Sequence, residues 1–358
     1  MVDAQANEIL THGIHRFLAD GVQYRDLLDI GKAIEKWSDW CPVWSDYAAA
    51  AVKRGEGALA ARARATAASE FVRASIYYHY AQNVFFDDLT VKRAAQQLKI
   101  DTFKRAAILL DPPLERVEIP FDGTFIPGYL RLPKGVAKPP CVLLLGGLDT
   151  TKEDYISLNN LCVERGLATF AFDGPGQGEM AWTTRWRPDF ERAIYAVLDY
   201  LETRREIDPG RIGLIGRSLG GHYGPKAAAG DSRLKAVVAW GACYEMIPIN
   251  QLPKMFREGW LFMTGESSIE AAEKRLDQAR TLEGIAPNIK CPLLIVHGGL
   301  DEWTPLPQAL RLAAEVSGPV EKLIWDDSIH CCHDRSHIVR PAMADYLARH
   351  LSVTEFTP

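Results

Sequence analysis

The sequence lacks the features that mark membrane, nucleic-acid-binding and exported proteins. Its 358 residues carry a formal net charge of only -5, so there is no basic excess for nucleic acid or anionic lipid. It has no run of about 18 apolar residues, and its first residues, MVDAQANEILTHGIHRFLADG, contain neither a basic nor an apolar signal region. We therefore expect a cytoplasmic protein whose partners are small molecules rather than nucleic acids or membranes.

Cysteine is scarce as well. The seven cysteines are an odd number, and only Cys331 and Cys332 are close in sequence, which favours reduced thiols over a disulfide framework. These two lie in the stretch HCCH at 330–333, which holds four candidate zinc ligands. Adjacent residues cannot readily surround one tetrahedral ion, so we expect no metal.

A dinucleotide-binding signature is also missing. The segment DGPGQGE at 173–179 resembles a phosphate-binding glycine loop, but the pattern G-x-G-x-x-G needs a glycine where Glu179 stands. We therefore expect no cofactor.

What the sequence does contain falls into two parts. Up to about Leu110, apolar residues recur at helical spacing with many alanines, as in ALAARARATAASEFVRASIYYHYAQNVFF at 58–86. The aromatic residues of this part either fill a core between helices or line a pocket. The following Asp-Pro-Pro at 111–113 breaks the pattern. The sequence therefore predicts a helical N-terminal domain over residues 1–112 and a second domain over 113–358.

The second part alternates short apolar runs with helix-length segments. A hairpin turning at Asp122 and Gly123 comes first. Six apolar runs follow, at 141–147, 167–174, 212–216, 234–241, 292–299 and 321–327. Continuous apolar strands joined through helices predict an α/β fold with a mostly parallel sheet covered on both faces. The stretch from Ala242 to Ile289 is longer than a crossover needs, so we expect an insertion at about 245–288.

One serine stands at a corner between a strand and a helix. Gly216-Arg217-Ser218-Leu219-Gly220 satisfies G-x-S-x-G, the pattern of a nucleophile elbow, in which a sharp turn holds the serine hydroxyl out above a sheet. A serine hydroxyl is a weak nucleophile unless a base and a third, orienting group accompany it. Ser218 is therefore a candidate nucleophile.

Candidates for those two groups follow in the order Ser, Asp, His. Asp301 is the first carboxylate after the apolar run LLIVHGG, and His330 follows the last predicted strand, so we expect both at the same rim of the sheet as Ser218. Other residues compete for these roles. The rival carboxylates are Glu302, Asp326 and Asp327, and the rival base is His333.

Acyl chemistry also needs donors for a developing oxyanion. We expect the backbone N–H groups of Leu219, directly after the serine, and of Leu148, in the loop after the run CVLLL. Thr150, with Glu153 three positions later, is predicted to cap the helix that follows. His222, four residues after the serine, is expected to be a packing residue.

These motifs resemble those of a known family. Residues 113 to 352 resemble the α/β-hydrolases. The texts GGLDTTKE, FDGPGQGEM, GRSLGG, HGGLDE and HCCH, with a helical part ending in LLDPP, are more specifically similar to the 2,6-dihydroxypseudooxynicotine hydrolase family and its related carbon–carbon hydrolases and esterases. The resemblance implies an α/β-hydrolase fold with an N-terminal helical cap and a triad of Ser218, Asp301 and His330.

The same resemblance implies an activity and an assembly. It implies hydrolysis of a carbon–carbon bond next to an aryl ketone, in a cavity between the cap and the hydrolase domain, by a homodimer. Glu245, which follows the strand ending at Gly241, is a candidate for handling the proton of the departing carbon; the alternative is a plain loop residue. A carboxylesterase with the same triad and a non-catalytic receptor on the same scaffold are the competing functions.

Overall fold

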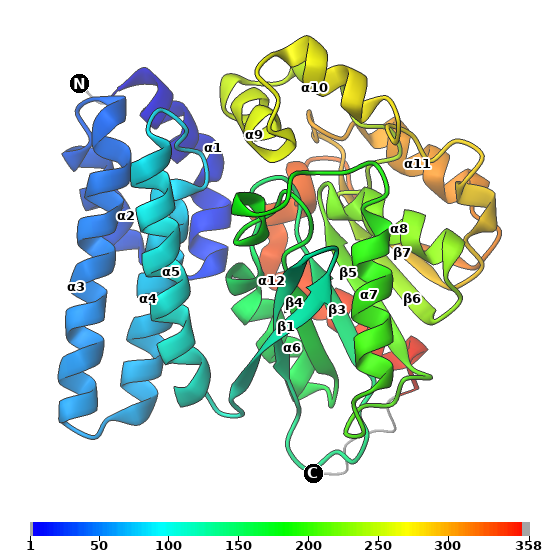
Figure 1. Ribbon diagram of the computed structural model, residues 1–358, viewed down its shortest axis with the longest axis horizontal. Helices are drawn as coiled ribbons and strands as arrows, with labels where there is room; N and C mark the ends of the chain where they lie inside the picture. Colours follow the sequence, from blue (N-terminus) through cyan, green and yellow to red (C-terminus); the bar gives the residue numbers. More distant parts are fainter. Residues whose placement is uncertain (1–2, 353–358) are drawn as a thin grey trace. The chain divides into compact units, whose positions relative to one another are not determined.

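The chain consists of two compact units. The computed structural model describes residues 3–352, and the division between its units falls between Arg116 and Val117 (Figure 1). The sequence-based boundary after residue 112 lies a few residues earlier, at the proline pair that ends the last helix of the first unit.

The first unit is helical. Its helices are α1 (Ala4–Asp20), α2 (Tyr24–Ala33), α3 (Trp40–Ala60), α4 (Arg64–Gln82) and α5 (Leu89–Leu109). Aromatic rings pack against one another between these helices. The ring centroids of Phe17 and Tyr80 lie 4.5 Å apart and those of Trp44 and Tyr80 5.6 Å apart, and the Trp40 indole N–H donates to the carbonyl of Tyr80. These contacts favour a core role for the aromatic residues of this unit.

The second unit contains an eight-stranded sheet. Its strands are β1 (Leu114–Phe121), β2 (Thr124–Arg131), β3 (Cys141–Leu145), β4 (Ala168–Phe172), β5 (Ile212–Arg217), β6 (Leu234–Trp240), β7 (Leu293–Gly298) and β8 (Val320–Trp325), in the order β1-β2-β4-β3-β5-β6-β7-β8. Strand β2 pairs antiparallel with β4, and the pairs from β4 to β8 are parallel. This confirms the predicted mostly parallel α/β fold.

The register of the central strands brings their carboxyl ends together. Leu145 of β3 pairs with Gly216 of β5, and Arg217 at the end of β5 pairs with Trp240 at the end of β6. Trp240 pairs in turn with Val296, near the end of β7. Since parallel strands end at the same edge, the loops that follow them meet at one rim, where ligands bind in open α/β sheets.

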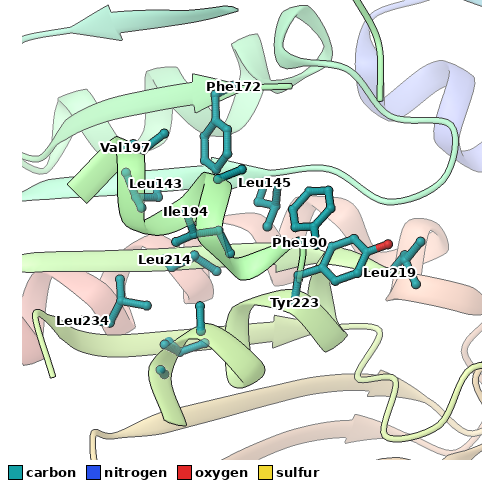
Figure 2. Packing of buried hydrophobic residues seen from close by; sticks show 14 of the residues in the cluster. Leu143, Leu145, Phe172, Phe190, Ile194, Val197, Leu214, Leu219, Tyr223 and Leu234 are labelled. Carbon is teal, nitrogen blue, oxygen red and sulfur yellow. The ribbon is translucent and has the colours of Figure 1, made fainter. Parts of the chain in front are cut away.

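Helices cover both faces of the sheet. They are α6 (Ile156–Glu164), α7 (Glu191–Glu202), α8 (Gly220–Gly230), α11 (Leu306–Glu315) and α12 (Ser336–His350). Apolar residues of α7 and α8 pack on one face and those of α6 and α12 on the other. Figure 2 shows Phe190 and Tyr223 beside Leu219 on the first face, and their rings stack with centroids 3.9 Å apart. The helix that follows the serine is thus anchored in the main core.

The segment predicted as an insertion lies between β6 and β7. It contains α9 (Lys254–Thr264) and α10 (Ile269–Leu276), and its two ends meet in an isolated antiparallel bridge between Glu245 and Thr281. No helix within residues 3–352 is long and apolar enough to cross a membrane.

Candidate active site

Ser218 occupies a strained corner between β5 and α8. Its φ is +57°, a left-handed conformation that side-chain-bearing residues rarely adopt. Backbone hydrogen bonds from the Ser218 N–H to the Trp240 carbonyl (2.7 Å) and from the Gly221 N–H to the Ser218 carbonyl (2.7 Å) hold the turn. This is the predicted nucleophile-elbow geometry.

The glycines on both sides of Ser218 are required by close backbone contacts. A Cβ on Gly216 would lie 2.0 Å from the carbonyl oxygen of Gly220, and a Cβ on Gly220 would lie 2.7 Å from the carbonyl oxygen of Leu145. Both distances are far below van der Waals contact, and both obstacles are backbone atoms that cannot rotate away. The corner therefore accepts only glycine at these two positions.

The structure brings His330 and Asp301 to this serine. The His330 Nε2 lies 2.9 Å from the Ser218 Oγ, and the His330 Nδ1 lies 2.7 Å from the Asp301 Oδ2. A carboxylate can only accept, so Nδ1 carries the proton it donates to Asp301. The neutral ring then presents Nε2 as an acceptor for the Ser218 hydroxyl, which is the arrangement a general base needs.

The Asp301 carboxylate is fixed by the loop that follows β7. Its Oδ1 accepts from the backbone N–H groups of Trp303 (3.0 Å) and Thr304 (2.8 Å), and its Oδ2 accepts from the Thr304 hydroxyl (2.7 Å). The carbonyl of Thr304 accepts in turn from the Nε2 of the fully buried His297 at 2.6 Å. Burial lowers the pKa of His297, so this ring is a neutral donor at pH 7.

The electrostatics of the Asp301–His330 pair favour an ionised acid. Burial would raise the pKa of Asp301, but the charge of His330 and hydrogen bonds from His330 and Thr304 outweigh burial and lower it to about 2. Burial likewise favours the neutral form of His330, but its interactions with Asp301 and Cys331 outweigh this and raise the His330 pKa well above its ordinary value. The pair thus stabilises an imidazolium, the form that arises when a base accepts a proton.

The loop after β3 lies directly against the elbow. A Cβ on Gly147 would lie 2.9 Å from the Cβ of Ser218 and 3.2 Å from the backbone nitrogen of Leu219. Within residues 3–352, the backbone N–H groups of Leu148 and Leu219 donate no hydrogen bond. Leu148 directly follows Gly147 and Leu219 directly follows Ser218, so both N–H groups stay candidate donors for a developing oxyanion.

Buried charges anchor the chain that follows this loop. Lys152 is fully buried, and its Nζ lies 2.7 Å from the Glu153 carboxylate, 2.8 Å from Asp173 and 2.9 Å from Glu179. The glycine-rich segment DGPGQGE supplies Asp173 and Glu179, so it packs against the loop through its acidic residues.

The predicted cap at Thr150 is wrong by one position. Thr151 is the N-cap and Asp154 completes its capping box, because the Thr150 hydroxyl accepts from Arg217 instead.

The rival residues lie elsewhere. Glu302, Asp326 and Asp327 are exposed, and Asp327 pairs with Arg335. The His333 ring packs edge-on against the Trp240 indole, 5.6 Å between centroids. His222 is fully buried; its Nδ1 lies 3.1 Å from the Cys243 carbonyl and burial lowers its pKa to about 4, as expected of a packing residue.

Glu245 is not part of the hydrogen-bond chain that links Ser218, His330 and Asp301. Glu245 is exposed, and its backbone N–H donates to the side-chain carbonyl of Gln308 at 3.0 Å. Its role in proton handling stays a prediction. No group of three or more His, Cys, Asp or Glu side chains within the described residues is arranged to hold a metal ion.

Three residues of the site were not predicted from the sequence. Thr304 orients the acid, Gln177 contacts the loop after β3, and the Trp303 ring packs edge-on against the His330 ring with centroids 5.0 Å apart. Phe256 of the insertion packs on Trp303 in the same way at 4.6 Å. The only sequence signal was the position of Trp303 and Thr304, two and three residues after Asp301.

Comparison with known proteins decides the family. The family described as Esterase FrsA-like matches residues 25–261, which are more than half of the chain and include Ser218. The chain belongs to the FrsA-like family of α/β-hydrolases. The predicted fold class and the predicted hydrolase family are thereby confirmed, and the chain is a hydrolase.

Individual relatives extend the match beyond residue 261. A protein from Paenarthrobacter nicotinovorans, named 2,6-dihydropseudooxynicotine hydrolase, is 35% identical over 344 residues, which cover 95% of this chain and 92% of the relative. Hydrolase LUC6 from a Fusarium species is 30% identical and covers 80% of each chain. The crystal structure of the 2,6-dihydroxy-pseudo-oxynicotine hydrolase matches with a TM-score of 0.88 at 33% identity, over 94% of this chain and 95% of that one.

Proposed function

We propose that this hydrolase works through an acyl-serine formed on Ser218, with His330 as general base and Asp301 as the group that orients it. The observation that carries the proposal is the pair of hydrogen bonds of 2.9 Å and 2.7 Å that link the three side chains. The substrate we favour is an aryl ketone, cleaved at the carbon–carbon bond next to its carbonyl.

The reaction follows from this geometry. The Ser218 Oγ adds to the carbonyl carbon while its proton passes to the His330 Nε2, and the electron pair of the C=O bond moves onto oxygen. The amides of Leu148 and Leu219 would receive that oxyanion; one such donor is typically worth about 2.7–4 kcal/mol of transition-state stabilisation. Collapse of the intermediate then breaks the carbon–carbon bond, His330 returns the proton to the departing group, and water hydrolyses the acyl-serine.

Two observations support a carbon–carbon bond as the target. The Paenarthrobacter relative is a hydrolase named for pseudooxynicotine, and its similarity spans nearly the whole of both chains. Aromatic side chains also stand next to the base, since Trp303 contacts His330 and Phe256 contacts Trp303. A departing carbanion is less stable than an alkoxide, so it needs protonation or an electron-rich ring. We propose Glu245 as an additional proton handler for this step.

The second candidate is a carboxylesterase. The family description names an esterase, and the same triad and oxyanion donors would serve ester hydrolysis without change. A non-catalytic receptor, the third hypothesis, would have no use for an ordered Ser218–His330–Asp301 chain. We further propose that residues 1–112 act as a cap over the substrate, and that the enzyme is a cytoplasmic homodimer.

Product analysis of a matched substrate panel tests the proposal. The panel compares an aryl ketone bearing ortho-hydroxyl groups, the same ketone without them, and an ester of the same size, with Ser218→Ala as the control. We expect the hydroxylated ketone to yield an acid and an arene by mass spectrometry, and the unsubstituted ketone to bind but to react much more slowly. Rapid ester turnover with every ketone returned intact would replace this proposal with the esterase.

A further inference from the structure

Gln177 uses its whole side-chain amide to hold the loop beside the nucleophile. Its Nε2 donates to the backbone carbonyls of Gly146 and Gly147, both at 2.8 Å, and its Oε1 accepts from the N–H of Gly174 at 3.0 Å. The residue is 1% exposed. These bonds use both hydrogens of the NH₂ group, and the bond from Gly174 identifies which end of the amide is oxygen.

These bonds set the direction of the next peptide unit. In a trans peptide the C=O and the N–H point in opposite directions. The Gly147 carbonyl faces Gln177, so the N–H of Leu148, which belongs to the same peptide unit, faces away from Gln177. A rotated peptide would turn that N–H towards Gln177 and leave the oxyanion position facing a carbonyl oxygen.

The same loop is tied to the elbow at its other end. The Arg217 guanidinium donates to the Thr150 hydroxyl at 2.6 Å and 3.1 Å, and Arg217 directly precedes Ser218. The loop from Gly146 to Thr150 is therefore held at both ends by buried side chains, with Gly147 pressed against Ser218 between them.

We propose that Gln177 is a positioning residue of the oxyanion hole. By holding the Gly146 and Gly147 carbonyls, it keeps the Leu148 N–H aimed at the oxygen that becomes negative when Ser218 adds to the substrate. The inference rests on the proposed acyl-serine chemistry but adds a residue to it, and it assigns a role to the glycine-rich segment 173–179. Gln177 touches no substrate atom and acts only through the backbone.

The test compares two inhibitors that differ in whether they form an oxyanion. 2,2,2-Trifluoroacetophenone accepts the Ser218 Oγ at its carbonyl carbon and becomes an anionic hemiketal, whereas the corresponding alcohol, 2,2,2-trifluoro-1-phenylethanol, cannot form one. Gln177→Met keeps the length of the side chain but removes both donors. Since deleting one oxyanion donor costs about 10²–10³ in kcat, we expect the misaimed peptide to lower kcat/KM for p-nitrophenyl acetate and affinity for the ketone together, by about 10- to 100-fold. Affinity for the alcohol should stay within about twofold.

Two further variants separate positioning from general damage. Gln177→Glu keeps an oxygen that accepts from the Gly174 N–H, but when ionised it cannot donate to the Gly146 and Gly147 carbonyls. This variant replaces Gln177→Met in the comparison if the methionine variant does not fold. Asn159→Leu removes another buried amide as a control. Asn159 lies in α6, on the sheet face opposite α7 and α8, and its side-chain oxygen accepts from Arg131 at 3.0 Å. This variant should leave the ratio of ketone affinity to alcohol affinity unchanged.

The possible failures are distinguishable. If the wild-type protein neither turns over the ester nor binds the ketone more tightly than the alcohol, the acyl-serine chemistry is wrong and the role of Gln177 is wrong with it. If the wild-type protein does both and the Gln177 variants retain its preference for the ketone, the proposed chemistry stands and the positioning role is refuted.

Discussion

The left-handed conformation of Ser218 predicts that the nucleophile lowers the stability of the fold. A residue with a Cβ in this conformation carries about 1–2 kcal/mol of strain that glycine does not. Glycine also gains backbone freedom in the unfolded chain, which opposes this by about 0.4–1 kcal/mol. Ser218→Gly should therefore unfold with a free energy about 1 kcal/mol higher than Ser218→Ala, although both lack the hydroxyl and its hydrogen bond to His330.

Urea unfolding at 25 °C measures this difference directly. With a urea m-value of about 1–3 kcal/mol/M, the glycine variant should have a midpoint about 0.3–1 M above that of the alanine variant. Both variants should lose several orders of magnitude of turnover, because each removes the nucleophile. The two variants would then differ in stability although they are equally inactive.

Lys138 supplies a matched control. It is exposed, has a φ of +49°, and lies in the same unit. The Ala and Gly variants at Lys138 should differ by a similar amount with no change in turnover. If that pair differs as expected while Ser218→Ala is as stable as Ser218→Gly, the reasoning about strain at the elbow is refuted.

Three further outcomes are expected from the contacts of the site. His330→Ala should reduce kcat by several orders of magnitude, whereas His333→Ala should reduce it only slightly, because His333 packs on Trp240. Steady-state kinetics with an aryl ester measure both variants, and the reverse ranking would reassign the base to His333. Asp301→Asn should lower kcat by about 10⁴. The wild-type base is lost as pH falls through the raised His330 pKa, so removing the carboxylate should move the acid limb of the pH–rate profile to lower pH. An unmoved limb would mean that Asp301 does not raise the pKa of His330. Lys152→Met should cost about 3–5 kcal/mol in urea unfolding, since it leaves three carboxylates without their buried cation, and an unchanged midpoint would mean that these groups bind a proton instead.

Local sequence was sufficient to predict the sheet and the elbow. Short, continuous apolar runs separated by helix-length segments have few arrangements other than a covered parallel sheet, and the predicted strands correspond to β3 to β8. The G-x-S-x-G pattern was equally informative because its glycines answer a backbone constraint: at Gly216 and Gly220 a side chain would collide with main-chain atoms. Asp301 and His330 could be chosen because strand-end residues of a parallel sheet meet at one rim.

Side-chain contacts between distant segments could be read only from the tertiary structure. The capping pattern at Thr150 was displaced to Thr151 because Arg217, far along the chain, engages the Thr150 hydroxyl. In the sequence, Gln177 is only one residue of a glycine-rich segment that does not match the dinucleotide-binding pattern. In the structure its amide donates to the carbonyls of Gly146 and Gly147, about thirty residues earlier in the chain. A pattern of residue types records what one segment prefers by itself, whereas a hydrogen bond across the sheet edge depends on where packing of the whole unit places the second segment.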